Sequence, residues 1–150
     1  MQSVKKKRKR ASVKTEKDKA WTFFSRYIRL RDCLETTGSI KIGLCCTCNH
    51  VVDYKKSQAG HFIPGRGGAI LFLENNVHLQ CYSCNVCMHG NMIEYLEFMK
   101  KKFGDRKVAE LINKRHETHQ WKVKELKEIK EKYKKMVDDI LMSVEQKNTK

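Results

Sequence analysis

Two Cys-x-x-Cys pairs separated by 32 residues constrain the fold of this 150-residue chain more than any other feature. The first pair is Cys45 and Cys48, and the second is Cys81 and Cys84. Two such pairs can place four thiolates around one ion in a tetrahedron, which is the arrangement of structural zinc sites. Four protein ligands leave no position for water, so we expect the zinc to stabilise a fold with a small hydrophobic core.

The remaining cysteines leave the exact ligand set open. Cys46 could replace its neighbour Cys45, although its spacing to the next cysteine is poorer, and Cys87 could compete with Cys84. Cys33 lies in a predicted helix, where we expect a small buried hydrophobic residue. The total of seven cysteines argues against a disulfide framework. A redox site would need one pair in a βαβ context, which the sequence lacks.

The formal net charge of +15 favours a polyanionic partner. Residues 1–19 carry a net charge of +7, which leaves +8 for residues 20–150, so a basic tail alone does not explain the charge. We therefore favour nucleic acid over a merely solvated surface. Consecutive basic residues near the start are expected to be disordered alone and to lie along phosphates, or else to form a generic solvated tail. These residues are Lys5, Lys6, Lys7, Arg8, Lys9 and Arg10.

Neither a membrane span nor a secretion signal is predicted. No apolar run approaches the ~20 residues that a transmembrane helix needs. A basic start followed by an apolar stretch and a small-residue cleavage site is also missing. We therefore expect a cytoplasmic protein, without membrane contact.

Apolar periodicity predicts helices on both sides of the cysteine pairs. The first covers residues 19–34, and its aromatic stripe is expected to face the core rather than to stack on bases. Arg26 and Arg29 lie elsewhere on its surface and are candidate DNA contacts. Further helices are predicted over 92–103, 105–117 and 122–146. The last has an apolar stripe that could pack on the body of the protein or on a second copy, giving a homodimer.

The residues between the cysteine pairs form a pattern that suits a site for phosphodiester hydrolysis. We expect a strand over 57–62, a loop over 64–68, a strand over 70–79 and a helix from residue 82. A neutral imidazole at His61 could take the proton from an attacking water, beside a divalent cation that stabilises charge at phosphorus. Asn76 could fix the turn that carries this histidine, and Asn85 at the helix start could bind the cation.

These motifs resemble those of the HNH, or His-Me finger, endonucleases and, more narrowly, those of the phage NinG/Rap recombination endonuclease family. The resemblance covers about residues 19–142 and depends on Ala59-Gly60-His61-Phe62, Asn76-Val77-His78-Leu79-Gln80-Cys81 and Cys84-Asn85, with a further matching stretch over 24–32. It implies a ββα-metal core and cleavage of branched DNA, such as Holliday junctions and displaced-strand structures, during phage recombination. It also implies His61 as general base, Asn76 as the central Asn, and Asn85 at the cation.

One position departs from the wider HNH pattern. The Asp that usually precedes the catalytic His and holds the cation is Gly60 here. Mg²⁺ favours oxygen ligands, so Glu74 or Asp53 could substitute. Alternatively, His78 could help to bind a softer ion such as Mn²⁺. The expected cofactors are therefore a structural zinc ion and a catalytic Mg²⁺ or Mn²⁺.

Three further side chains are candidates for the site. His78 shares a strand face with Asn76, so a role at the metal or the phosphate is as well supported as a structural hydrogen bond. His89 and Arg66 are candidate phosphate contacts, with simple exposure as the alternative for each. The expected partner is branched double-stranded DNA, and other recombination proteins are further candidates.

Together these patterns predict an α+β protein with a small zinc-stapled ββα-metal core flanked by helices. We expect a basic disordered arm over 1–18, an N-terminal helix and linker over 19–43, a zinc-bound HNH nuclease core over 44–91 and a helical region over 92–150. The alternative function is that of a non-catalytic zinc-ribbon DNA-binding protein. It explains the charge and the cysteines equally well, but leaves His61, Asn76 and Asn85 as coincidence.

Overall fold

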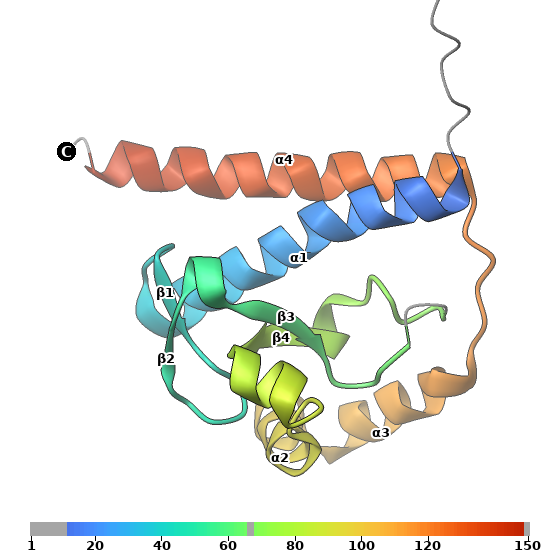
Figure 1. The fold of residues 1–150 in the computed structure, drawn as a ribbon, viewed down its shortest axis with the longest axis horizontal. Coiled ribbons are helices and arrows are strands. Elements are labelled where there is room, and N and C mark those ends of the chain that lie inside the picture. Colours follow the sequence, from blue (N-terminus) through green and yellow to red (C-terminus); the bar gives the residue numbers. More distant parts are fainter. Residues whose placement is uncertain (1–11, 66–67, 149–150) are drawn as a thin grey trace, which may run out of the picture.

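The computed structural model describes residues 12–65 and 68–148 and shows a mixed α+β protein. Its helices and strands are α1 (Val13–Thr37), β1 (Ile42–Leu44), β2 (Val51–Asp53), β3 (Gln58–His61), β4 (Val77–Gln80), α2 (Met92–Phe103), α3 (Asp105–Asn113) and α4 (Val123–Asn148). The long helices α1 and α4 form one layer, the β3–β4 hairpin lies beneath α1, and α2 and α3 lie on the other side of the hairpin (Figure 1). Within the described residues, no helix combines the length and the apolar character needed to cross a bilayer.

Helix α1 begins earlier than its periodicity predicts. Ser12 caps the helix, because its hydroxyl oxygen accepts a hydrogen bond from the Thr15 amide, and Gly38 ends it with a φ of 70°. Residues 13–18 are therefore helical, which corrects their expected place in a disordered arm. The basic run from Lys5 to Arg10 lies outside the described residues.

The aromatic stripe of α1 faces the core, as predicted. Phe24 and Ile28 are fully buried, and the Phe24 ring meets the ring of Tyr133 edge-on, with centroids 4.9 Å apart. On α4, Leu126 and Val137 are also fully buried. The apolar stripe of α4 thus packs on the body of the same chain, along α1, and the two helices run in the same direction (Figure 1).

The central hairpin is shorter than expected on its second strand. β3 and β4 pair antiparallel, with His61 opposite Val77 and Gly60 opposite His78. The predicted strand over 70–79 is wrong for residues 70–76, which form turns and a 3₁₀ helix over Glu74–Asn76. Backbone bonds between residues three apart, such as Leu73 N–H to the Ile70 carbonyl at 3.3 Å, take the place of a strand ladder there.

Two further differences concern the segments that contain the two Cys-x-x-Cys pairs. The β1–β2 hairpin was not predicted, because each of its strands has only three residues and apolar side chains such as Ile42 and Val51 are exposed, so the sequence has no apolar–polar alternation there. The helix expected from residue 82 is a single π-helical turn, Ser83–Cys87. His89, Gly90 and Asn91 then have positive φ values, and α2 begins only at Met92. The predicted helices over 92–103, 105–117 and 122–146 are present with small shifts at their ends.

A buried carboxylate on α1 anchors β4 to this helix. Asp32 accepts hydrogen bonds from the Leu79 amide and from Arg31 Nε, each at 2.7 Å, and lies 3.5 Å from His78 Nδ1. Burial alone would raise the pKa of Asp32, but the hydrogen bond with His78 and the charge of Arg31 lower it below its ordinary value. Arg31 also donates to the Val77 carbonyl, at 3.0 Å. The side chains of Asp32 and Arg31 therefore hold β4 against α1.

Replacing this carboxylate should destabilise the protein strongly. In Asp32→Ala the buried Leu79 amide loses its acceptor and Arg31 loses its charged partner, and we expect a loss of about 3–5 kcal/mol in the free energy of unfolding. Urea unfolding of the zinc-loaded protein measures this loss. Asp18→Ala on the same helix is the control, since Asp18 is exposed and should change stability by less than about 0.5 kcal/mol. Equal stability of the two variants would contradict the anchoring role.

Candidate metal centre and active-site cleft

The four cysteines of the two Cys-x-x-Cys pairs come together in space. The sulfur atoms of Cys45, Cys48, Cys81 and Cys84 all lie within 4.8 Å of one another. The Cys48 and Cys81 sulfurs are 3.8 Å apart. Tetrahedral zinc with Zn–S bonds of about 2.3 Å separates its sulfur ligands by about 3.8 Å. This cluster therefore fits a zinc ion, and it is the ligand set that the spacing favours.

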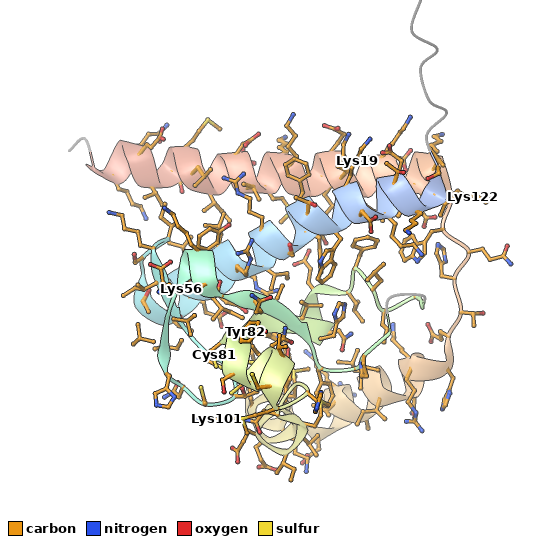
Figure 2. The ribbon with its side chains drawn as sticks, in the orientation of Figure 1. Lys19, Lys56, Cys81, Tyr82, Lys101 and Lys122 are labelled. Carbon is orange, nitrogen blue, oxygen red and sulfur yellow. The ribbon has the colours of Figure 1, made fainter. Side chains whose placement is uncertain are left out.

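Backbone hydrogen bonds build the two turns that carry these sulfurs. In the first turn the Asn49 amide donates to the Cys45 carbonyl at 2.9 Å, and Asn49 adopts a φ of 59°. The Cys46 amide donates to the Leu79 carbonyl at 2.9 Å, which ties this turn to β4. In the second turn the Cys84 amide lies 3.4 Å from the sulfur of Cys81, which follows β4 directly. Figure 2 labels Cys81 and Tyr82 where the chain leaves the hairpin for the short helical turn.

The cluster contains one thiol that ionises easily. Burial raises the pKa of Cys45, but hydrogen bonds from the Thr47 hydroxyl and from the backbone of Cys48 and Cys81 outweigh it and lower the pKa to about 6. Burial and the neighbouring sulfurs of Cys45 and Cys84 raise the pKa of Cys48 to about 12. A divalent cation would favour the thiolate form of all four cysteines, because it offsets their mutual repulsion.

The other three cysteines lie outside this cluster. Cys46 packs against the core around Tyr95, where burial raises the pKa of its thiol far above the ordinary value. Cys87 is exposed. Cys33 is fully buried, as predicted, and burial raises its pKa to about 11. Neither Cys46 nor Cys87 therefore competes for the ion in the described structure.

A cleft of about 360 Å³ brings together three of the predicted site residues. His61 enters it from β3, Asn85 from the π-helical turn and His89 from the residues that follow. The complete lining in the described structure is Trp21, Ala59, His61, Pro64, Gly65, Asn85, His89, Gly90 and Met92. None of these residues is acidic, so the cleft has no carboxylate of its own among the described residues.

His61 is held by contacts on two sides. Its Nε2 lies 3.2 Å from the Leu71 carbonyl oxygen, and the Trp21 ring stacks on the imidazole with a centroid distance of 4.9 Å and an interplanar angle of 16°. A carbonyl only accepts hydrogen bonds, so the proton of a neutral His61 lies on Nε2. Nδ1 then carries the lone pair that can accept a proton. The ring therefore has the tautomer and the fixed orientation that a general base needs.

Asn76 holds the backbone just after His61. Its side-chain oxygen accepts from the Ile63 amide at 2.8 Å, and its Nδ2 donates to the Ile63 carbonyl at 3.0 Å. The Phe62 amide donates to the Asn76 carbonyl at 2.8 Å. Asn76 is fully buried and does not line the cleft. It thus makes the turn-fixing contacts expected of it, from the 3₁₀ helix rather than from the strand.

The structure does not bring His78 to the cleft. His78 is buried, and its Nδ1 lies 3.1 Å from Arg31 Nη2 and 3.5 Å from Asp32. On the other side its ring contacts the Phe98 ring of α2, with centroids 5.0 Å apart. Burial lowers the pKa of His78 and favours the neutral ring. The proposed catalytic role of His78 is therefore corrected to a structural one, beside the Asp32 carboxylate that holds β4 against α1.

The two acidic side chains expected to replace the missing Asp also lie elsewhere. Glu74 accepts hydrogen bonds from the hydroxyls of Tyr27, at 3.3 Å, and Tyr133, at 2.9 Å, and so links α1, α4 and the 3₁₀ helix. Asp53 accepts from the Lys55 amide at 2.7 Å and caps a short turn. Neither residue lines the cleft that holds His61, which corrects both predicted cation ligands.

The predicted DNA contacts are distributed unevenly. Arg26 is exposed on α1, whereas Arg29 lies over the Tyr54 ring at 4.7 Å and donates to its carbonyl at 3.3 Å. His89 is exposed at the cleft. Arg66 lies outside the described residues, as does the basic run at the start of the chain. Figure 2 labels lysines on well-separated elements, including Lys19 on α1, Lys101 on α2 and Lys122 beside α4, so the positive charge is not confined to one helix.

Sequence reasoning did not place Trp21 in the cleft. Trp21 packs against the core, as expected, but it also lines the cleft and stacks on His61. An aromatic residue on the core-facing stripe of a helix gave no signal for this second contact. Gln80, which directly precedes Cys81, is fully buried at the end of β4 and does not line the cleft.

Comparison with known proteins identifies the family. A family model described as Bacteriophage Lambda NinG protein matches residues 1–142. The chain belongs to the NinG family. Its similarity to Protein ninG of Escherichia phage 933W is 31% identity over 97 residues, which is 64% of this chain and 47% of that protein. Protein ninG of Escherichia phage lambda and that of Salmonella phage P22 are each 30% identical over 97 residues, with the same coverage.

The chain spans about half the length of these NinG relatives. No solved structure matches the chain. Family membership confirms the NinG resemblance that the motifs around His61 and the cysteines indicate.

Zinc binding should depend on the clustered cysteines alone. After dialysis against a competing chelator, we expect wild type to retain about one zinc per chain and Cys84→Ser to lose nearly all of it, because three thiolates bind far more weakly than four. Zinc analysis together with circular dichroism measures both metal content and folding. Cys87→Ser is the matched control from the same turn and should keep its zinc. Loss of zinc in this control would show that the ligand set is different.

Proposed function

We propose that this NinG-family protein is a metal-dependent DNA endonuclease of the HNH, ββα-metal type that cuts branched recombination intermediates. Holliday junctions and displaced-strand structures in phage DNA are the expected substrates. The observation that carries the proposal is His61, which is fixed by Trp21 and Leu71 in one cleft with Asn85 and His89. A DNA-binding module without catalysis would not need an oriented imidazole of this kind.

The local architecture supports the ββα-metal assignment. The β3–β4 hairpin is followed directly by the π-helical turn, and the cysteine cluster joins this turn to the turn after β1. Two elements, β3 and the π-helical turn, therefore present His61 and Asn85 to the same cleft. A phosphodiester group could reach both side chains at once.

The three polar side chains of the cleft, His61, Asn85 and His89, each have a chemical role in this proposal. Nδ1 of His61 takes the proton from the attacking water, while Leu71 and Trp21 keep the ring in place. Asn85 contributes an oxygen ligand, and His89 donates a hydrogen bond to the phosphate. A bound Mg²⁺ or Mn²⁺ would supply charge stabilisation at the phosphoryl oxygen and at the leaving 3′ oxygen.

The charge of the chain supports a backbone-dominated interaction with DNA. The net charge of +15 and the spread of lysines over several elements favour contacts with phosphates from more than one duplex arm. Selectivity would then come from branch geometry rather than from base sequence. The site of action would be the cytoplasm of the bacterial host, and other recombination proteins are candidate partners. A homodimer, which paired cuts would favour, would need a surface other than the side of α4 that packs on α1.

A non-catalytic zinc-ribbon DNA-binding protein is the second candidate. The observation in its favour is the lack of a carboxylate among the described residues of the cleft. It shares the zinc site and the charge with the nuclease, so DNA affinity and its salt dependence do not separate the two. Cleavage does.

Removing the imidazole should abolish cleavage and spare binding. With a synthetic four-way junction and Mg²⁺ or Mn²⁺, we expect His61→Ala to cut at least about 100-fold more slowly than wild type, since general bases contribute roughly 10²–10⁴-fold. Gel-shift titration should give an unchanged affinity. His116→Ala is the control, because His116 is exposed and lies outside the cleft. If wild type cuts no branched DNA with either ion, the binding module is the better description.

A further inference from the structure

The space beside Gly60 holds two amide oxygens. A Cβ atom built on Gly60 would lie 2.0 Å from Gln80 Oε1 and 2.8 Å from Asn85 Oδ1. Gly60 has no positive φ, so space rather than backbone conformation excludes a side chain there. Gly60 is also the position at which the wider HNH pattern has its cation-binding Asp. The structure thus places oxygens from two other residues close to where that side chain would begin.

The orientation of the Gln80 amide is fixed by its neighbours. Its Nε2 donates to the Gly90 carbonyl at 2.8 Å and to the Thr47 hydroxyl at 3.2 Å. Because a carbonyl only accepts hydrogen bonds, the NH₂ end must face Gly90 and the oxygen must point the other way. Oε1 is fully buried and has no hydrogen-bond partner in the described structure. A buried oxygen without a partner is costly, and a cation ligand role would account for it.

The geometry of the two oxygens suits a small divalent cation. The two distances to the Cβ position together limit the separation of Gln80 Oε1 and Asn85 Oδ1 to at most 4.8 Å. Oxygen ligands of an octahedral ion of the size of Mg²⁺ are about 3 Å apart when adjacent and about 4.2 Å apart when opposite. Asn85 also lines the cleft that contains His61, so an ion held by both oxygens would be next to the base.

We propose that Gln80 Oε1 and Asn85 Oδ1 are protein ligands of the divalent cation, and that Gln80 replaces the carboxylate missing at Gly60. The inference rests on the proposed nuclease function. Both ligands are neutral, so the protein alone binds the ion weakly, and phosphate oxygens of DNA complete the site and supply its negative charge. Cation binding is therefore coupled to substrate binding.

The direct test measures Mn²⁺ binding by electron paramagnetic resonance on the full, zinc-loaded chain, with and without an uncleavable four-way junction. Gln80→Met removes the oxygen at similar volume, and we expect Mn²⁺ affinity to fall at least tenfold while zinc content stays the same. Gln58→Met is the matched control, since Gln58 lies opposite Gln80 in the hairpin and outside the cleft. Mn²⁺ affinity of Gln80→Met within twofold of wild type would overturn the proposal.

A second pair of variants guards against an effect of folding. Gly60→Ala should also weaken Mn²⁺ binding, because its Cβ would displace Gln80 Oε1. The double variant Gly60→Asp with Gln80→Ala makes room for a carboxylate, and we expect it to bind Mn²⁺ more tightly than wild type in the absence of DNA. If Gln80→Met loses its zinc, the double variant tests the position of the ion instead. A double variant that does not bind Mn²⁺ would contradict the proposed position.

Binding and cleavage separate this inference from the function on which it rests. Mn²⁺ binding that depends on Gln80, without cleavage of any branched DNA, would support the cation site and overturn the nuclease. Cleavage by wild type that is unchanged in Gln80→Met would support the nuclease and overturn the role of Gln80.

Discussion

The four-cysteine cluster is the constraint on which the other elements depend. Over residues 12–65 and 68–148, the buried apolar side chains form three small groups rather than one large core, so packing alone leaves the turns weakly defined. The cluster joins the turn after β1 to the turn after β4, and the Cys46 amide adds a hydrogen bond to Leu79 of β4. An ion held there would fix the π-helical turn against the hairpin. Asn85 follows Cys84 directly, so the cluster also fixes one side of the cleft.

The other side of the cleft depends on long-range contacts. The hairpin is anchored to α1 by Asp32, which binds the Leu79 amide, and His61 is stacked on Trp21 of the same helix. Asn76 completes the arrangement, because it holds the Ile63 backbone with two hydrogen bonds. A single helix therefore positions both β4 and the proposed base. This shared dependence gives polar residues that do not line the cleft, such as Asp32, a part in positioning it.

Local patterns were most informative where a short segment determines its own structure. The four-cysteine cluster followed from spacing, because Cys-x-x-Cys places two sulfurs on one side of a tight turn. The helices over 92–103 and 122–146 followed from apolar periodicity. The same reasoning failed over residues 70–76, where apolar content suggested a strand but turn hydrogen bonds are formed instead. It also missed the cap at Ser12, which extends α1 to Val13.

The sequence by itself determined the cysteine cluster and the α+β class, because these depend on local spacing and periodicity, and the family resemblance singled out His61 and Asn85, which line one cleft. Only the tertiary structure decided which polar groups share the cleft. His78 and Glu74 lie within a few residues of Asn76 in the chain, yet they bind Asp32 and two tyrosines. Gln80 points its buried oxygen toward the gap at Gly60. The direction of a side chain depends on the elements packed against it, and these come from distant parts of the sequence.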